Sequence, residues 1–186
     1  MALSVNFSTF TVECSPENKL AHVFAERGLL NKSTDAPWVE FHTACASDSS
    51  GSAILYDASD SSSLHLRAVL GEKERNKFQK TRKASHKVQL LVIDHFMGRR
   101  SEPICAVKVD AQGHDFAVLR GAKATIVRHR PVLYFEHSVS MLGELETKRF
   151  LPWVRAMGYQ CMPRNCLDCH VLCTPAPGSV LKRLSL

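Results

Sequence analysis

The sequence predicts an α/β domain with a doubly wound, mainly parallel sheet that is covered by helices and closed by a C-terminal antiparallel hairpin. Short apolar runs alternate with helical patterns along most of the chain, which is typical of βαβ units. The run at 104–110, "ICAVKVD", is almost continuously apolar, as expected for a central parallel strand. It ends on Asp110, and Gly113 and a helical pattern follow. Ligands bind at such strand ends in α/β sheets.

The composition limits how the chain is organised. Its 186 residues, 45% hydrophobic and 23% charged, suit one folded domain over 1–186. No run reaches the roughly 18 to 20 apolar residues of a membrane span. The N-terminus lacks the basic start and apolar core of a secretory signal. Its Ser and Thr content resembles a transit peptide for an organelle, but its alternating apolar residues favour a strand. We therefore expect an intracellular, cytoplasmic protein.

Positive charge is concentrated in one segment, 71–87, which holds seven Lys and Arg residues and two glutamates. A nucleic-acid surface would combine such charge with several aromatic residues for base stacking, whereas this segment has only Phe78. We interpret it as a flexible, solvated basic connection and expect no nucleic-acid partner.

Apolar periodicity and turn residues predict the order of elements in the first half of the chain. The expected elements are a strand at 3–13, a helix at 14–28, a strand at 37–47, a short edge strand after Gly51 and a strand at 87–92. Asp94 then breaks the apolar pattern and is a plausible cap for a short helix.

The second half continues the alternation. The expected elements are a helix at 114–129, a buried strand at 130–136, a helix at 144–159 that is kinked or divided at Pro152, and a hairpin made of 159–163 and 169–175. In such a hairpin, Cys169 and Cys173 share one face of a strand and His170 points to the other face.

Three predicted strands end in carboxylates, namely Glu13, Asp110 and Glu136. Because the carboxyl ends of parallel strands meet at one edge of a sheet, we expect these three side chains to lie at the same edge. Carboxylates there can bind hydroxyl groups or accept a proton.

The seven cysteines suggest a competing reading. Four possible zinc ligands, or a C-x-x-C-H haem-attachment pattern, crowd one short segment: Cys166, Cys169, His170 and Cys173. Zinc sites usually have two separated ligand pairs, and haem attachment needs export. We expect no metal or haem, and mostly reduced thiols in and around the hairpin.

Several stretches together resemble one family, the FkbM-type methyltransferases that use S-adenosylmethionine (AdoMet). "VKVDAQGHDFAVLRGA" resembles that family's "KIDVEGHELEVLKGA", and "TVECSPEN" resembles its "FEP" stretch. The other similar stretches are "ACASDSSGSAIL", "VQLLVIDHF", "RPVLYFEHS" and "GYQCMP". The resemblance runs in order from about residue 5 to about residue 175, and it implies a Rossmann-like methyltransferase fold.

The resemblance also implies roles for individual residues. Glu13 would bind the cofactor ribose, and Ser47 and Asp48 would lie near the adenine. Asp110 would face the methionine end of AdoMet and the methyl acceptor. The candidates for the base or for acceptor contact are Asp110, His114, Asp115 and Glu136, with His137 as a further residue on the acceptor side.

The sequence departs from the family pattern in three places. Gln112 and Asp115 stand where the family usually has Glu. The family's first strand and its glycine-rich loop, of the form D-x-G-A-N-x-G, have no counterpart before Glu13. We therefore expect an N-terminally incomplete copy of the domain, with a degenerate relative as the alternative. We also expect the chain as written to bind AdoMet weakly or not at all.

Methyl transfer to a hydroxyl oxygen of a small-molecule or glycan acceptor is the function that the resemblance implies. The alternatives are a non-catalytic binding or interaction protein that retains the fold, and a small cysteine-site metalloprotein.

Overall fold

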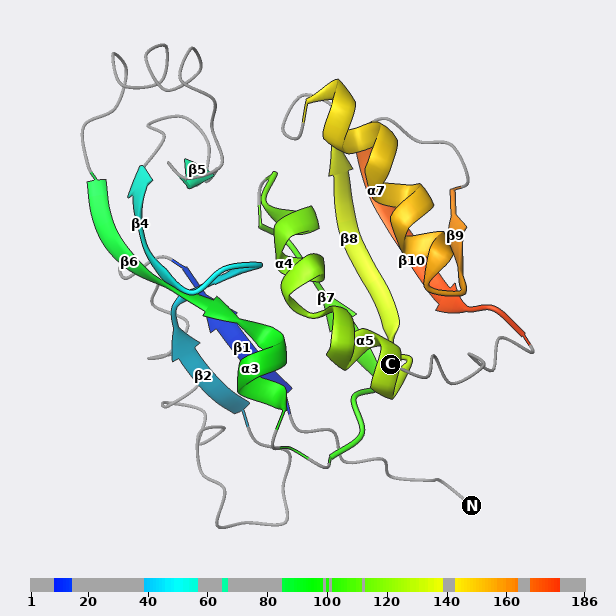
Figure 1. Ribbon diagram of the computed structural model, residues 1–186, viewed down its shortest axis with the longest axis horizontal. Helices are drawn as coiled ribbons and strands as arrows, with labels where there is room; N and C mark the ends of the chain where they lie inside the picture. The colour runs from blue at the N-terminus through cyan, green and yellow to red at the C-terminus, as the bar shows by residue number, and fades with distance from the viewer. Residues whose placement is uncertain are drawn as a thin grey trace.

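The computed structural model describes residues 9–14, 39–56, 65–66, 85–98, 100, 102–111, 113–138, 143–163 and 168–177. Within these ranges the strands form three separate sheets, and the helices lie among and against them (Figure 1). The predicted helix at 14–28 lies outside the described residues except for Cys14. The predicted basic connection also lies outside them, except that its last three residues begin a strand at Ser85.

The C-terminal half forms a four-stranded mixed sheet in the order β7-β8-β10-β9. β7 and β8 are parallel, whereas β10 is antiparallel to both β8 and β9. The predicted closing hairpin is therefore confirmed. The strands are β7 (Ala106–Lys108), β8 (Val132–Ser138), β9 (Tyr159–Met162) and β10 (Asp168–Pro175).

The prediction that the strand at 104–110 is central was wrong. In the described residues β7 is a three-residue strand at the edge of its sheet. Ala106 and Lys108 are exposed, and Val107 is only half-buried. The buried residue of this apolar run is Val109, which follows β7. Val109 donates its N–H to the Tyr134 carbonyl at 2.8 Å.

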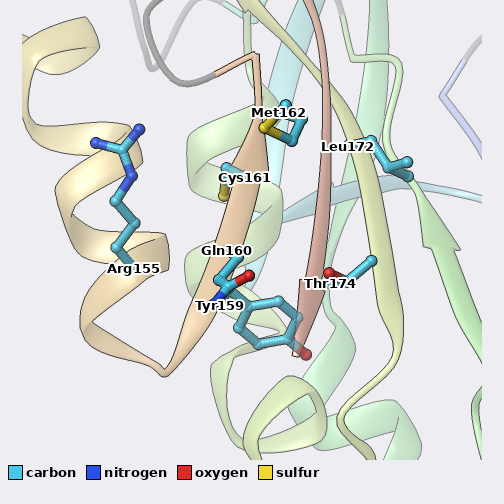
Figure 2. Close-up of a pocket in the computed structure, with 7 residues that line it drawn as sticks. All are labelled: Arg155, Tyr159, Gln160, Cys161, Met162, Leu172 and Thr174. Carbon is cyan, nitrogen blue, oxygen red and sulfur yellow. The ribbon is translucent and has the colours of Figure 1, made fainter. Parts of the chain in front are cut away.

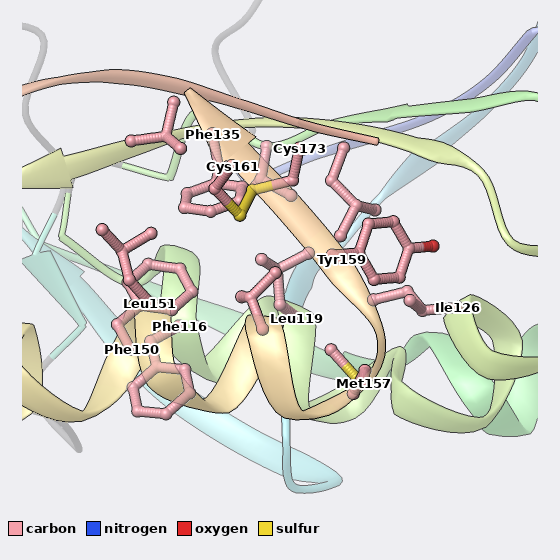
Figure 3. Packing of buried hydrophobic residues seen from close by; sticks show 14 of the residues in the cluster. Phe116, Leu119, Ile126, Phe135, Phe150, Leu151, Met157, Tyr159, Cys161 and Cys173 are labelled. Carbon is pink, nitrogen blue, oxygen red and sulfur yellow. A yellow bond between two sulfur atoms is a disulfide. The ribbon is translucent and has the colours of Figure 1, made fainter. Parts of the chain in front are cut away.

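Helices α4, α5 and α7 cover one face of this sheet and form the main core with it (Figures 1 and 3). Phe150 of α7 lies at its centre, fully buried and stacked on Phe116 and Phe135 with ring centroids 4.6 and 4.7 Å apart. The predicted apolar face of this helix is confirmed, because Phe150, Val154 and Met157 are all buried. The helices are α4 (Asp115–Gly121), α5 (Lys123–His129) and α7 (Glu144–Ala156).

A second mixed sheet has the order β3-β6-β4-β5. β3 is parallel to β6, and β4 is antiparallel to both β6 and β5. β4 therefore lies inside the sheet and is not the edge strand that was predicted. The strands are β3 (Cys45–Ser47), β4 (Gly51–Tyr56), β5 (His65–Leu66) and β6 (Ser85–Val92).

The third sheet consists of two parallel strands, β1 (Thr9–Glu13) and β2 (Val39–Thr43). The predicted strand at 37–47 is thus divided at Ala44, and its two halves belong to different sheets. The structure is a mixed α/β fold, and the single, mainly parallel sheet that was predicted is not seen in the described residues. Apolar patterning identifies strands, but which strands pair depends on contacts between distant residues.

The short helix α3 (Ile93–Met97) follows β6 directly. We predicted that Asp94 caps α3. It instead caps the start of α5. Its two carboxylate oxygens accept the backbone N–H groups of Ala124 and Thr125 at 2.9 and 2.8 Å. These are N–H groups that a helix leaves without internal partners, so α3 stabilises α5 and joins β6 of the second sheet to the helices of the C-terminal half.

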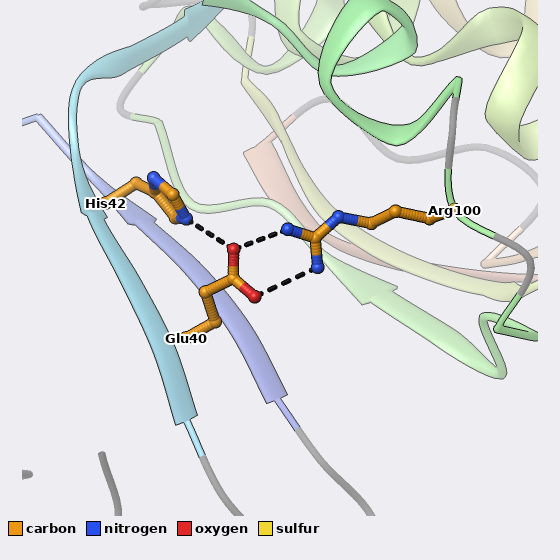
Figure 4. Close-up of polar contacts among 3 residues, drawn as sticks. All are labelled: Glu40, His42 and Arg100. Carbon is orange, nitrogen blue, oxygen red and sulfur yellow. Dashed lines mark hydrogen bonds and ion pairs between the residues drawn. The ribbon is translucent and has the colours of Figure 1, made fainter. Parts of the chain in front are cut away.

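Phe96 of α3 and Arg100, which follows α3, connect this part of the chain to the two-stranded sheet. Figure 4 shows the contacts of Arg100 with Glu40. Phe96 stacks on Phe10 of β1 at 4.5 Å, and the Arg100 guanidinium lies 4.4 Å from the Phe96 ring. Arg100 also donates to both carboxylate oxygens of Glu40, one of which lies 2.8 Å from His42 Nε2. This bidentate ion pair raises the pKa of Arg100.

The predicted helix at 114–129 is two helices that meet at Ala122. The second one ends at Arg130, which has a left-handed backbone with φ of 53°. The Arg130 guanidinium lies 4.6 Å from the Tyr159 ring and donates to the carbonyls of Met157 and Gly158, the latter at 2.7 Å. Arg130 thereby ties the end of α5 to the turn between α7 and β9.

Disulfides overturn the expectation of reduced thiols. Cys14 is bonded to Cys45, and Cys161 is bonded to Cys173 across the β9–β10 pair. Cys169 is also disulfide-bonded. Among the described residues only Cys105 is free, and it is exposed. Spacing along the chain does not reveal such pairs, because strand pairing brings the partners together.

Candidate functional site

Asp110 and Glu136 lie at the same end of two paired parallel strands. Lys108 of β7 pairs with Tyr134 of β8, and the two carboxylates follow two residues later on each chain segment. Asp110 is exposed and lies 3.4 Å from Lys108 Nζ, and Glu136 is half-buried. The prediction is therefore correct for this pair. It was wrong for Glu13, which ends β1 in a different sheet.

Asp115 is fully buried at the start of α4, and backbone N–H groups surround its carboxylate. Oδ2 accepts from Ala111 and Gly113, and Oδ1 accepts from Glu136, all at 3.3 Å. Burial raises the pKa of Asp115 to about 6, and the charge of Glu136 adds to the rise, while the N–H groups oppose it. Asp115 thus holds the β7–α4 turn against β8.

His114, the residue before Asp115, is buried and contacts the second sheet. Its Nε2 lies 3.1 Å from the hydroxyl of Ser47, which is only 2% exposed. Nδ1 is buried and has no hydrogen-bond partner among the described residues. Burial lowers the pKa of His114 to about 4, with Arg120 adding to the decrease and Asp48 opposing it. The imidazole is therefore neutral near pH 7.

Arg120 and Gly121 dock α4 onto the end of β3. A β-carbon on Gly121 would lie 2.0 Å from the Ser47 carbonyl oxygen, so only glycine permits this approach. Arg120 donates to Asp48 Oδ2 through Nε and Nη2, both at 2.8 Å, and to Glu146 of α7 at 3.2 Å. The loop after β3, α4 and α7 are joined in this way.

Glu13 is linked to the beginning of β3. Its carbonyl accepts the Ala44 N–H at 3.0 Å, and the next residue, Cys14, is disulfide-bonded to Cys45. Ser47 ends β3 two residues after Cys45. The carboxyl end of β1 is therefore linked to the beginning of β3, whereas the end of β3 and the strand ends of β7 and β8 meet the first turn of α4.

His137 does not lie with Glu136. It alternates with Glu136 along β8, is 3% exposed, and points into the core near Phe150. Its Nε2 lies 3.1 Å from the Thr147 carbonyl of α7, and a carbonyl can only accept, so Nε2 carries the proton. His137 therefore fixes α7 to the sheet.

The pocket shown in Figure 2, about 480 Å³ in volume, lies elsewhere. It opens beside β9 and β10, and no predicted site residue lines it. Its lining consists of Arg155, Tyr159, Gln160, Cys161, Met162, Leu172 and Thr174. No convergent acidic or nucleophilic groups are present in that lining, so the first turn of α4 is the better candidate site.

The groups at the candidate site suit AdoMet. Both contacts of Arg120 with Asp48 use Oδ2, and within the described ranges Oδ1 makes no hydrogen bond, which leaves an acceptor for an amino group such as that of adenine. Glu13 and Asp110 are carboxylates at strand ends. The Ser47 side chain, by contrast, is engaged by His114, so only the backbone of residue 47 could line a nucleoside.

Sequence reasoning missed Arg120, the Cys14–Cys45 disulfide and the group formed by Glu40, His42 and Arg100. The spacing of Glu40 and His42, two apart on a strand, placed them on one face. Nothing local indicated Arg100, which comes 60 residues after Glu40.

Two of the four candidate zinc ligands in the C-terminal segment, Cys169 and Cys173, are in disulfides. Across the described residues, no group of three or more His, Cys, Asp or Glu side chains could hold a metal ion. None of the helices in those ranges combines the length and the apolar character needed to cross a bilayer.

Comparisons with known proteins agree with this fold. A structure of a methyltransferase FkbM from Methylobacillus flagellatus KT is similar, with a TM-score of 0.52 and 14% sequence identity. The match covers 89% of this chain but 36% of that one, so this chain spans about a third of its length. Among curated proteins, none matches significantly. The model of a family described as the methyltransferase FkbM domain matches residues 10–161. Because this match covers most of the chain, the protein belongs to the FkbM methyltransferase domain family.

Proposed function

We propose that this domain transfers a methyl group from AdoMet to a hydroxyl oxygen of a small-molecule or glycan acceptor. Membership of the FkbM family suggests methyl transfer. The observation that supports a hydroxyl acceptor is the placement of Asp110 and Glu136 at the same end of two paired parallel strands, beside the first turn of α4.

Asp110 and Glu136 are the groups best placed to take the acceptor's proton. A hydroxyl group is a weak nucleophile until a base accepts its proton. Asp115 uses both of its oxygens on backbone N–H groups, and His114 Nε2 contacts Ser47. These two residues therefore orient the turn and the helix, and we assign acceptor contact to the two strand-end carboxylates, of which Asp110 also pairs with Lys108.

Glu13, the backbone at Ser47, Asp48 and Asp110 would hold the cofactor. Bound AdoMet would supply an electrophilic methyl group on its sulfonium sulfur. The protein's contribution would then be to position the acceptor oxygen in line and to receive its proton, and positioning of this kind accounts for much of the rate of such reactions.

Methyl transfer from isotopically labelled AdoMet to a panel of sugars and other hydroxyl compounds tests the proposal. We expect the label on oxygen. We expect Asp110→Asn and Glu136→Gln each to reduce transfer, and the variant that removes the base to reduce it by roughly 10²- to 10⁴-fold. Glu102→Gln, an exposed carboxylate outside the site, is the control. Label on nitrogen, or unchanged transfer in both site variants, would contradict the assignment.

Cofactor binding is tested separately by ligand-observed NMR, which detects weak complexes. We expect AdoMet signals to broaden with the protein, S-adenosylhomocysteine to compete, and Glu13→Gln to weaken the effect. Competition by sulfonium compounds that lack adenosine, without competition by S-adenosylhomocysteine, would argue against the ribose contact.

The alternative is a non-catalytic binding protein with this fold. One observation favours it, because in the described residues β1 and β7 do not pair, so that Glu13 and Asp110 belong to different sheets. A protein that binds AdoMet but gives no labelled product with any hydroxyl acceptor would support this alternative.

A further inference from the structure

We propose that the outer edge of β9 is a docking site for an extended peptide in which acidic and apolar side chains alternate. Such a peptide would add a strand to the C-terminal sheet beside β9. The pocket along this edge contains no residue of the candidate site (Figure 2), so docking there would be separate from methyl transfer.

β9 is the last strand of its sheet. In the order β7-β8-β10-β9 it pairs with β10 on one side, and no strand of the described ranges pairs with its other side. A strand at the edge of a sheet presents backbone N–H and C=O groups that can pair with another chain. β9 therefore has one side on which a further strand can be added.

The register of β9 and β10 determines which backbone groups face outwards. Ala176 donates its N–H to the Gly158 carbonyl at 2.9 Å, which continues the register of the two strands. Hydrogen-bonded and non-hydrogen-bonded pairs alternate along an antiparallel ladder. Cys161 and Cys173 are thus a non-hydrogen-bonded pair, as their Cα separation of 4.0 Å also indicates. The backbone N–H and C=O groups of Tyr159 and Cys161 consequently point away from β10.

The pocket passes around this edge of the sheet. Four of its lining residues are exposed and lie on the face of the sheet opposite the helices, namely Gln160, Met162, Leu172 and Thr174. A further one, Arg155, comes from α7 on the helix side of β9 (Figure 2). Side chains from both faces can line one pocket only where it passes the edge of the strand. A strand added there would contact both sets of side chains.

Tyr159 and Cys161 contribute backbone to the same pocket. Their side chains lie in the core, where the Tyr159 hydroxyl donates to the Pro131 carbonyl at 2.9 Å and Cys161 is bonded to Cys173. Each of the two residues is only 3% exposed. The part of each residue that lines the pocket is therefore its main chain, which can pair with a peptide of any sequence.

The side chains around the edge determine the chemistry of the peptide. Among the described residues that line the pocket, Arg155 is the one charged side chain, and it is exposed. Met162 and Leu172, 63% and 46% exposed, lie opposite each other and form an apolar patch on the open face. Side chains of an added strand alternate between the two faces. Acidic residues would thus face Arg155, and apolar residues would face Met162 and Leu172.

A second copy of this chain fits the edge less well. Two β9 edges placed side by side would bring two Arg155 side chains to one interface, and the described lining supplies no carboxylate for either of them. Like charges across an interface are unfavourable. An acidic, extended peptide is therefore the occupant that the charges favour.

Hydrogen exchange of the full chain with a synthetic probe tests the proposal. The probe is a capped six-residue peptide in which Glu and Val alternate. In the protein alone, the amides of Tyr159 and Cys161 should exchange fast, whereas those of Gln160 and Met162, which bond to β10, should be protected. Saturating probe should slow exchange at Tyr159 and Cys161 by about tenfold or more.

Two results in the absence of the probe would overturn the proposal. Protection of the Tyr159 and Cys161 amides at every protein concentration would show that other residues of this chain occupy the edge. Protection that increases with protein concentration would show that a second copy occupies it.

Chemical variants of the probe separate backbone pairing from charge attraction. N-methylation of all its amides removes the N–H groups that pair with β9 but keeps the Glu charges, so it should abolish the protection. Lys in place of Glu keeps the backbone but reverses the charge, so it should weaken binding. Equal binding of the N-methylated and the parent probe would show that no strand is added.

Protein variants test the two faces of the site. Arg155→Gln should weaken binding of the Glu–Val probe by about two- to fivefold, as expected for an exposed ion pair. Its matched control is Arg149→Gln, which is exposed on the same helix and lies outside the pocket lining. Met162→Ser should also weaken binding, and Leu145→Ser, at a position 61% exposed in α7, is its control. Equal effects of the pocket variants and their controls would overturn the assignment of the two faces.

Discussion

Gly121 and Ser47 are in direct contact, so close that a β-carbon at position 121 would lie 2.0 Å from the Ser47 carbonyl oxygen and 2.8 Å from its carbonyl carbon. The contact brings α4 of one layer against β3 of a different sheet. It determines where His114 and Asp115 lie, because both are in or next to the first turn of the same helix.

Gly121→Ala should destabilise the protein. The clash is with backbone atoms, which cannot rotate away, so either α4 or β3 must move, at a cost of about 1–3 kcal/mol or more. Urea denaturation measures the change. Lys123→Ala, an exposed neighbour in α5, is the control and should stay within about 0.5 kcal/mol. Equal stability of Gly121→Ala and the parent would show that the two elements are not packed this closely.

His114 and Asp115 should give opposite pH dependences that largely cancel. The pKa of Asp115 is raised to about 6 in the folded state, so its contribution to stability is lost as the pH rises from about 4 to 6. The pKa of His114 is lowered to about 4, so its contribution is lost as the pH falls from about 6.5 to 4. Each shift corresponds to about 3 kcal/mol.

Single variants should reveal the two pH dependences of stability that cancel in the parent protein. With Asp115→Asn, the free energy of unfolding should rise between about pH 4 and 6.5, because only His114 remains. With His114→Gln, which keeps a donor for Ser47, it should fall over about pH 4 to 6. Urea titrations at several pH values measure both slopes. Slopes of the same sign in the two variants would contradict the assigned protonation states.

Arg100→Met should loosen the two-stranded sheet. Glu40 is 13% exposed at its side chain, and it would lose the guanidinium that donates to both of its oxygens. We expect a loss of about 1–2 kcal/mol, below the cost of breaking a fully buried pair. Lys148→Met removes the exposed pair with Glu144 in α7 and should have no measurable effect. A loss that is equally large in both variants would mean that burial of the pair is irrelevant.

Phe150→Ala should be the most damaging of these changes. The ring is fully buried between Phe116 and Phe135, and truncation at such a site costs about 3–5 kcal/mol. Leu145→Ala in the same helix, at a position 61% exposed, is the control. A small effect at Phe150 would place the centre of the core elsewhere.

Much of the local structure could be predicted from the sequence. Strict alternation in β10 places Cys169 and Cys173 inward and His170 outward, as the structure confirms. Helical spacing identified the buried face of α7, and the order of β7, α4 and β8 followed from the carboxylate, the glycine and the apolar runs. These features depend on residues that are neighbours in sequence.

The parts that could not be predicted depend on distant partners. Ser47 meets His114 across 67 residues, and Arg120 meets Asp48 across 72. The break at Ala44 sends β2 and β3 into different sheets, and no local signal in "HTACAS" marks it. Cysteine pairing has the same origin, because Cys161 and Cys173 meet through the register of β9 and β10.

Arg130 shows how backbone and side-chain preferences can conflict at one position. Its φ of 53° is the geometry for which a protein engineer would choose glycine. Glycine would relieve the backbone but would also remove the guanidinium that binds the Met157 and Gly158 carbonyls and covers Tyr159. Redesign guided by backbone angles alone would therefore replace the residue that joins two ends of the core, and position 130 should be excluded from glycine scans of helix termini.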